Sequence, residues 1–239
     1  LNVNYAVWLS RLTPKPVLVI DLDNSCSATS LLAKDEDVSG DFDTIAECLA
    51  KDLDFKSAVI KSKYENIEII PASPAVIRAH RFVSGQVNIA KFFRRKIEPL
   101  LENYSMIIVD CPPTLNNLIT SSYLAMDEII IPVNMDSFSI DSMGILMDEI
   151  EGISADFNIP GPDIKIAINR FIANRNAFKD VQGYFCLTTS YRNEYKCMPI
   201  VIPFAGIVGP KGVTSSSVFN DCIQNIQSDF ISDMLEPVY

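Results

Sequence analysis

Short apolar runs alternate with longer amphipathic segments along most of the chain. The run at 16–21, Pro-Val-Leu-Val-Ile-Asp, is rich in β-branched residues, too short for a helix and closed by a carboxylate. Such a run is typical of a strand buried on both faces of a parallel sheet. Comparable runs occupy 67–70, 106–110, 128–133, 164–169 and 199–203.

Stretches with helical spacing of apolar residues separate these runs. They predict helices over 2–12, 43–53, 74–84, 87–103, 115–124, 138–157, 176–187 and 214–235. Strands that alternate with helices form right-handed βαβ units around a sheet covered on both faces. We therefore expect an α/β protein with three layers, α/β/α, around a mostly parallel twisted sheet. No repeat or linker divides the chain, so residues 1–239 are expected to form a single domain.

Composition narrows the class of protein. Of 239 residues, 48% are hydrophobic and 21% are charged, which excludes a disordered chain. No apolar run reaches the roughly 18 residues of a membrane span, so we expect a soluble protein without membrane association. Six cysteines without a C-x-x-C pair are expected to be reduced and to indicate a cytoplasmic protein. The net charge of −10 argues against a surface that binds nucleic acid all round.

Polar residues follow the ends of several predicted strands. Asp21 and Asp23 end one strand, Asp110 ends another, and Asn169 ends a third. Ligands of open α/β sheets bind at the carboxyl ends of the strands. Any one of these side chains could simply mark the return of the chain to solvent, but their convergence on one edge predicts a functional site.

The segment at 106–113, Met-Ile-Ile-Val-Asp-Cys-Pro-Pro, is the most specific in the sequence. An apolar strand that ends in one Asp is a Walker B arrangement, which aims a carboxylate at the water shell of a phosphate-bound Mg²⁺. With the following Cys-Pro-Pro, it resembles the ParA/MinD family of deviant-Walker ATPases. Further segments resemble that family in the same order along the chain, namely 1–9, 17–23, 27–31, 65–73, 125–133 and 141–150, whereas 24–26, Asn-Ser-Cys, depart from the family's Pro-Gln-Gly.

The resemblance implies a P-loop NTPase-like fold, with ATP and Mg²⁺ as cofactors, and roles for three carboxylates. In the family, the second Asp of the Asp-Leu-Asp stretch lies beside the attacking water, which implies that Asp23 is catalytic. Asp21 and Asp110 match positions that organise magnesium. Asn169 matches an Asn that reads the adenine edge, and Ile202 and Pro203 match a segment that packs against adenine.

The family's glycine-rich phosphate loop would precede Leu1, and no glycine occurs before Gly40. We expect this loop to lie upstream of the sequence, which makes ATP hydrolysis conditional on it. A loop-less, non-catalytic scaffold of the same fold is the alternative. In the family, a lysine of the loop reaches the partner's nucleotide, which implies a homodimer with ATP sandwiched between the subunits.

A basic stretch lies between Glu68 and Glu98, where no acidic residue occurs. In ParA-type proteins, basic surface residues hold the dimer on nonspecific DNA, and a few such charges suffice for phosphate neutralisation. An ordinary solvated helix surface is the other interpretation. The candidate DNA-binding residues are Arg78, Arg81, Lys91, Arg94, Arg95 and Lys96.

The segment 214–235 has helical spacing of apolar residues but no Lys/Arg-rich face, which argues against a membrane anchor. The resemblance thus implies a ParA-type ATPase of DNA or plasmid partition, stimulated by a ParB-like partner and associated with nucleoid or plasmid in the cytoplasm. A related ATPase that positions another cargo is the alternative within the family.

Overall fold

A computed structural model describes residues 2–34, 42–85, 88–134, 137–171 and 200–203. The chain divides into two compact units, of which the first contains Leu1–Asp127 and Glu149–Pro162 and the second Glu128–Asp148 and Asp163–Tyr239. Each unit has a sheet of its own. That the chain is a single domain stays a prediction.

The first unit is built on a four-stranded, mostly parallel sheet with the order β2-β3-β1-β4. Its strands are β1 (Val17–Asp21), β2 (Ile60–Lys61), β3 (Ile67–Ile70) and β4 (Met106–Asp110). Strand β1 pairs in parallel with both β3 and β4, and only the short β2 runs antiparallel. All five residues of β1 are buried, as its apolar, β-branched sequence predicts.

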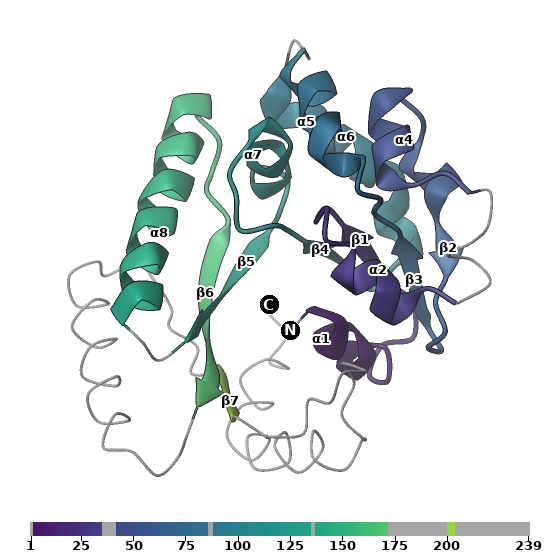
Figure 1. Cartoon of the computed structure of the whole chain (residues 1–239), viewed down its shortest axis with the longest axis horizontal. Helices are drawn as coiled ribbons and strands as arrows, with labels where there is room; N and C mark the ends of the chain where they lie inside the picture. The colour runs from purple at the N-terminus through teal and green to yellow at the C-terminus, as the bar shows by residue number, and fades with distance from the viewer. Residues whose placement is uncertain (1, 35–41, 86–87, 135–136, 172–199, 204–239) are drawn as a thin grey trace, which may run out of the picture. The chain divides into compact units, whose positions relative to one another are not determined.

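Helices cover both faces of this sheet because successive strand residues point to opposite sides. Leu18 and Ile20 pack into one hydrophobic cluster with residues of α4 to α7, whereas Val17 and Val19 pack into another with residues of α1 and α2 (Figure 1). The first unit is therefore a three-layer α/β/α structure. Its helical segments are α1 (Asn2–Leu9), α2 (Ser27–Leu32), α4 (Ile45–Ala50), η1 (Phe55–Ala58), α5 (Val76–Ser84), α6 (Ile89–Ile97), η2 (Glu98–Asn103) and α7 (Asn117–Tyr123).

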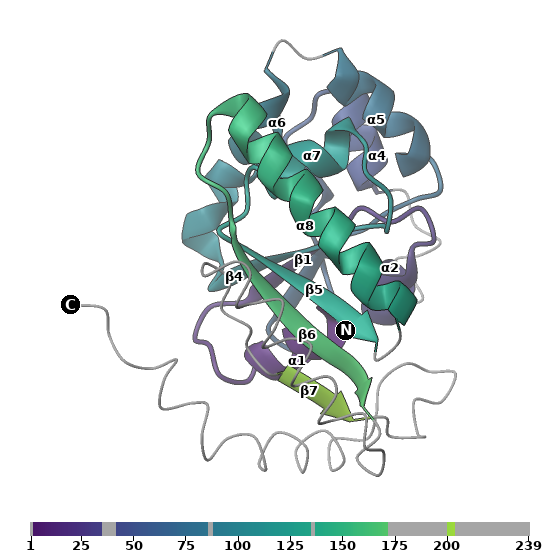
Figure 2. The same ribbon diagram turned by 90° about the vertical axis from the view of Figure 1, so that its left-hand side faces the viewer.

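The second unit contains a parallel sheet with the order β5-β6-β7. Its strands are β5 (Glu128–Asn134), β6 (Asp163–Phe171) and β7 (Ile200–Pro203), which lie side by side in Figure 2. The connection from β5 to β6 includes the long helix α8 (Ser137–Phe157). Parallel pairing requires such a crossover.

The α/β class, the mostly parallel sheet and all six predicted strands are confirmed. The predicted helix at 87–103 divides into α6 and η2, because Pro99 stands at the start of η2 and cannot donate a helical hydrogen bond. The strand β2 and the helix α2 were not predicted. The helices predicted at 176–187 and 214–235 lie outside the described residues.

Candidate functional site

Three acidic side chains gather at the carboxyl ends of β1 and β4. Asp21 and Asp110 are the last residues of these strands and are directly paired in register. The backbone N–H of Leu22 donates to the backbone oxygen of Asp110 at 2.8 Å, which extends the pairing by one step. Asp23 follows immediately. The prediction that Asp21, Asp23 and Asp110 share one sheet edge is therefore confirmed.

The carboxylate of Asp21 is completely buried and accepts three hydrogen bonds. Its Oδ1 accepts from the N–H of Asp23 at 3.0 Å. Its Oδ2 accepts from the N–H of Thr29 at 2.9 Å and from the Thr29 hydroxyl at 2.7 Å. Burial raises the pKa of Asp21, and the hydrogen bonds from Thr29 oppose that shift. These contacts favour a role in holding the Asp23 turn, while a place for Asp21 in the magnesium shell stays a prediction.

The Asp23 side chain is half-buried and stabilises its own turn. Its Oδ1 accepts the N–H of Ser25 at 2.8 Å, and its backbone oxygen accepts the N–H of Cys26 at 3.0 Å. Cys26 has a left-handed φ of 54° and caps α2. An Asp commonly closes a turn in this way. Since Oδ1 is occupied by the turn, Oδ2 is the oxygen that can meet a water molecule.

The Asp110 side chain is half-buried at the end of β4 and meets the start of α1. Its Oδ1 accepts a hydrogen bond from Asn2 Nδ2 at 2.6 Å. Burial raises the pKa of Asp110, and the contact with Asn2 opposes that shift. Among the described residues none donates a hydrogen bond to its other oxygen, Oδ2, which could therefore meet a water molecule or an ion.

Magnesium in nucleotide sites takes one or two carboxylates together with phosphate oxygens and water. Within the part of the chain that the structure describes, no group of three or more His, Cys, Asp or Glu side chains is arranged to hold a metal ion. Asp110 presents a single carboxylate from a rigid strand, which fits a magnesium ion that a phosphate group also binds.

The three residues predicted to meet adenine belong to the second unit. Asn169 lies near the end of β6 and pairs in register with Asn134 at the end of β5. Ile202 and Pro203 end β7, where Pro203 pairs with Phe171. All three thus lie at the carboxyl edge of the β5-β6-β7 sheet, and their contact with adenine stays a prediction.

The six basic candidates fall into two groups. Lys96 Nζ lies 2.6 Å from Asp52 Oδ1 and donates to the backbone oxygen of Leu53 at 2.9 Å, and Arg94 Nη1 donates to the backbone oxygen of Ala125 at 3.3 Å. These two side chains therefore tie α6 to its neighbours. Arg94 remains exposed despite this contact, and the other four are exposed as well, with Arg78 and Arg81 on α5 and Lys91 and Arg95 on α6.

The sequence patterns did not predict two residues that contact the carboxylates at the sheet edge, Thr29 and Asn2. Thr29 holds Asp21 and also accepts the backbone N–H of Ala72 at 2.8 Å, and Asn2 holds Asp110. Both contacts join residues from different elements, and no periodicity or strand-end position marks them.

Every helix among the described residues is too short or too polar to cross a lipid bilayer.

Known proteins resemble this chain in sequence and in fold. It is 27% identical over 191 residues to the chromosome partitioning protein ParA of Myxococcus xanthus, covering 77% of this chain and 65%, just under two thirds, of that protein. An ATP complex of a McdA variant from Cyanothece has a TM-score of 0.79 at 17% identity, covering 100% of this chain and 93% of that chain. Cobyrinic acid a,c-diamide synthase from Mycobacterium smegmatis, with a bound ATP analogue and magnesium, has a TM-score of 0.69 at 21% identity, covering 94% and 86%.

At these identities the two solved structures show the fold alone, and it is the α/β fold that the alternation of strands and helices predicted and that the family resemblance implied. The model of a protein family described as an AAA domain, AAA_31, matches residues 1–162. This match contains α1, the whole β2-β3-β1-β4 sheet and the three carboxylates at its edge. The chain belongs to this AAA domain family and, as its similarity to ParA also indicates, is related to the ParA/MinD-type P-loop ATPases.

Proposed function

We propose that the protein is a ParA-type ATPase of DNA or plasmid partition. ATP closes a homodimer, the dimer binds nonspecific DNA, and a ParB-like partner stimulates the hydrolysis that releases it. The observation that carries this proposal is the pair of carboxylates at adjacent strand ends, Asp21 and Asp110, with Asp23 two residues beyond, in a chain of this family. The protein would act in the cytoplasm on nucleoid or plasmid DNA.

Each carboxylate has a distinct task in this proposal. ATP with Mg²⁺ supplies the phosphoryl group that passes to water. Asp23 orients that water through Oδ2, because its Oδ1 is fixed by Ser25. Asp110 holds the magnesium ion through water, and Asn2 fixes the direction of its carboxylate. Asn169, Ile202 and Pro203 meet adenine.

Release of inorganic phosphate from ATP by the full-length protein tests the catalytic part of the proposal. We expect release that requires Mg²⁺ and rises when DNA and the ParB-like partner are present. No release above the uncatalysed background under any of these conditions would contradict an ATPase and favour the non-catalytic scaffold.

The exposed arginines of α5 are proposed to contact DNA phosphates. Replacing Arg78 and Arg81 together by Gln should weaken binding of the ATP-bound protein to a duplex of arbitrary sequence by about tenfold at low salt, since each removes a phosphate contact. The slope of log affinity against log salt should become shallower by about two per protomer. Fluorescence anisotropy across a salt series measures both quantities.

A matched variant separates this effect from the loss of net charge. Lys56 and Lys61 are exposed residues of η1 and β2, and their replacement by Gln changes the charge equally. At physiological salt, where long-range charge is screened, this control should keep the affinity within about threefold, while the Arg78 and Arg81 variant still weakens it. Equal losses in the two double variants would refute a contact at α5. Absence of DNA retention in the unchanged protein, even at low salt, would favour an ATPase that positions another cargo.

A further inference from the structure

A buried hydroxyl joins three separate segments at the carboxyl edge of the first sheet. Thr29 lies in α2 and is 7% exposed. Its Oγ1 donates to Asp21 Oδ2 at 2.7 Å and accepts the backbone N–H of Ala72 at 2.8 Å. Asp21 ends β1, whereas Ala72 lies in the turn after β3. One side chain therefore connects β1, α2 and the turn that leads to α5.

The direction of the Thr29 hydroxyl proton follows from its two partners. A backbone N–H can only donate, so the Thr29 oxygen must accept from Ala72. An ionised carboxylate can only accept, so the hydroxyl proton must point at Asp21. Serine and threonine are the side chains of this size that both donate and accept. Valine has nearly the same shape and can do neither.

Asp21 connects Thr29 to the backbone of Asp23 by a further hydrogen bond. The oxygen of Asp21 that Thr29 leaves unoccupied, Oδ1, accepts the N–H of Asp23 at 3.0 Å. The backbone of Asp23 is thus held by a carboxylate that Thr29 holds in turn. Because Thr29 is connected to Asp23 through Asp21, any effect of Thr29 on Asp23 acts through Asp21.

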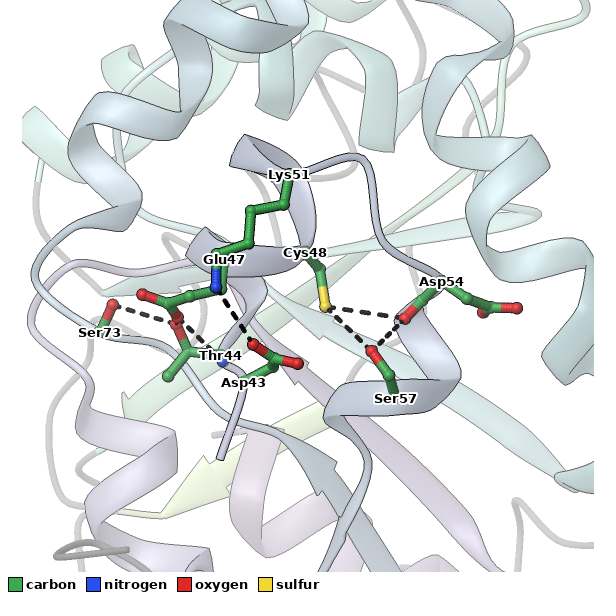
Figure 3. A network of polar contacts seen from close by, with 8 residues as sticks. All are labelled: Asp43, Thr44, Glu47, Cys48, Lys51, Asp54, Ser57 and Ser73. Carbon is green, nitrogen blue, oxygen red and sulfur yellow. Dashed lines mark hydrogen bonds and ion pairs between the residues drawn. The ribbon is translucent and has the colours of Figure 1, made fainter. Parts of the chain in front are cut away.

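The other side of the connection reaches α4 and α5. Pro71 accepts the N–H of Ile45, the first residue of α4, at 2.9 Å. The hydroxyl of Ser73 lies 3.1 Å from that of Thr44, which caps α4 together with Glu47 (Figure 3). The N–H of Val76, at the start of α5, donates to the backbone oxygen of Ser73 at 2.9 Å. Three successive residues, 71–73, therefore anchor two helices to the strand end.

We propose that Thr29 is a positioning residue, which sets the place of Asp23 through Asp21 and couples the Asp23 turn to the segment 71–73. Its effect on catalysis rests on the proposed ATPase function. The coupling itself rests on the hydrogen bonds alone. A shift of the Asp23 turn during the reaction would be transmitted through Thr29 to the start of α5, the helix that carries Arg78 and Arg81.

Two variants of Thr29 in the full-length protein test the proposal. In Thr29→Val, kcat for ATP hydrolysis should fall about tenfold while KM changes by less than about threefold, since ground-state binding does not use Asp23. Thr29→Ser keeps the hydroxyl and should restore kcat to within about threefold. Amide hydrogen exchange should be about tenfold faster at Ala72 and Asp23 in Thr29→Val than in Thr29→Ser. Ser154→Ala is the control, since it removes a buried hydroxyl that donates to the backbone oxygen of Ile150 within α8, and it should leave kcat unchanged.

Equal kcat values in Thr29→Val and Thr29→Ser would overturn the positioning role, and so would equal exchange at Ala72. If Thr29→Val does not fold, amide exchange in the unchanged protein tests the coupling. Exchange at Ala72 as fast as in an exposed turn would overturn the coupling, and protection of the Ala72 amide that is retained in Thr29→Ser supports it. An unchanged protein that hydrolyses no ATP contradicts the proposed function, and amide exchange then decides the coupling by itself.

Discussion

Replacing Asp23 by Asn should lower kcat for ATP hydrolysis at least about 100-fold while leaving the affinity for ATP nearly unchanged. The amide oxygen of Asn can still accept the N–H of Ser25, so the turn is preserved. The charge that orients water is lost. Single-turnover measurement of phosphate release, with ATP binding measured in parallel, separates the two quantities.

Asp54 provides a matched control for Asp23. Its Oδ1 accepts the N–H of the residue two positions on, Lys56, at 2.9 Å, in the same kind of turn. Asp54→Asn should therefore leave kcat unchanged. A fall in kcat of less than about threefold in Asp23→Asn, or an equal fall in both variants, would show that Asp23 has no direct part in catalysis.

Replacing Asp21 by Ala is expected to lower the free energy of unfolding by about 3 kcal/mol, because three hydrogen-bond donors lose a buried acceptor. These donors are the N–H of Asp23 and the N–H and hydroxyl of Thr29. Relief from burying the carboxylate offsets part of the loss, since burial already raises the pKa of Asp21. Urea unfolding followed by circular dichroism measures the change.

Asp54→Ala serves as the comparison for stability. Asp54 is exposed and caps η1 with a single backbone contact from its side chain, so its loss should cost about 1 kcal/mol. If Asp21→Ala destabilises the protein no more than Asp54→Ala does, the contacts of Asp21 do not hold the sheet edge together. The structural role assigned to Asp21 would then be wrong.

The strands could be predicted because their sequences allow few alternatives. Runs of four apolar, mostly β-branched residues such as 17–20 or 106–109 are too short for a helix and too apolar for a loop. The helix α2 could not be predicted in this way. Its sequence, Ser-Ala-Thr-Ser-Leu-Leu, spans only six residues, too few to show a helical periodicity, and the hydrogen bonds that Thr29 donates to Asp21 stabilise it.

The site was predictable only as far as strand ends mark it. Asp21 and Asp110 are adjacent because β1 and β4 are paired in register, and parallel strands end at one edge. Charge pattern, in contrast, did not separate Lys96, which is tied to Asp52 and Leu53, from the exposed Lys91 on the same helix. Such contacts depend on which elements meet in the folded chain, and a linear pattern does not contain that information.

Isothermal titration of ATP into the full-length protein, with and without Mg²⁺, measures whether the protein binds nucleotide together with magnesium. We expect binding that Mg²⁺ strengthens, and loss of that magnesium effect in Asp110→Ala, because Asp110 is proposed to hold the ion from the end of β4. Asp54→Ala should retain the magnesium effect. Absence of ATP binding with and without Mg²⁺, or a magnesium effect unchanged in Asp110→Ala, would refute the proposed magnesium–nucleotide site.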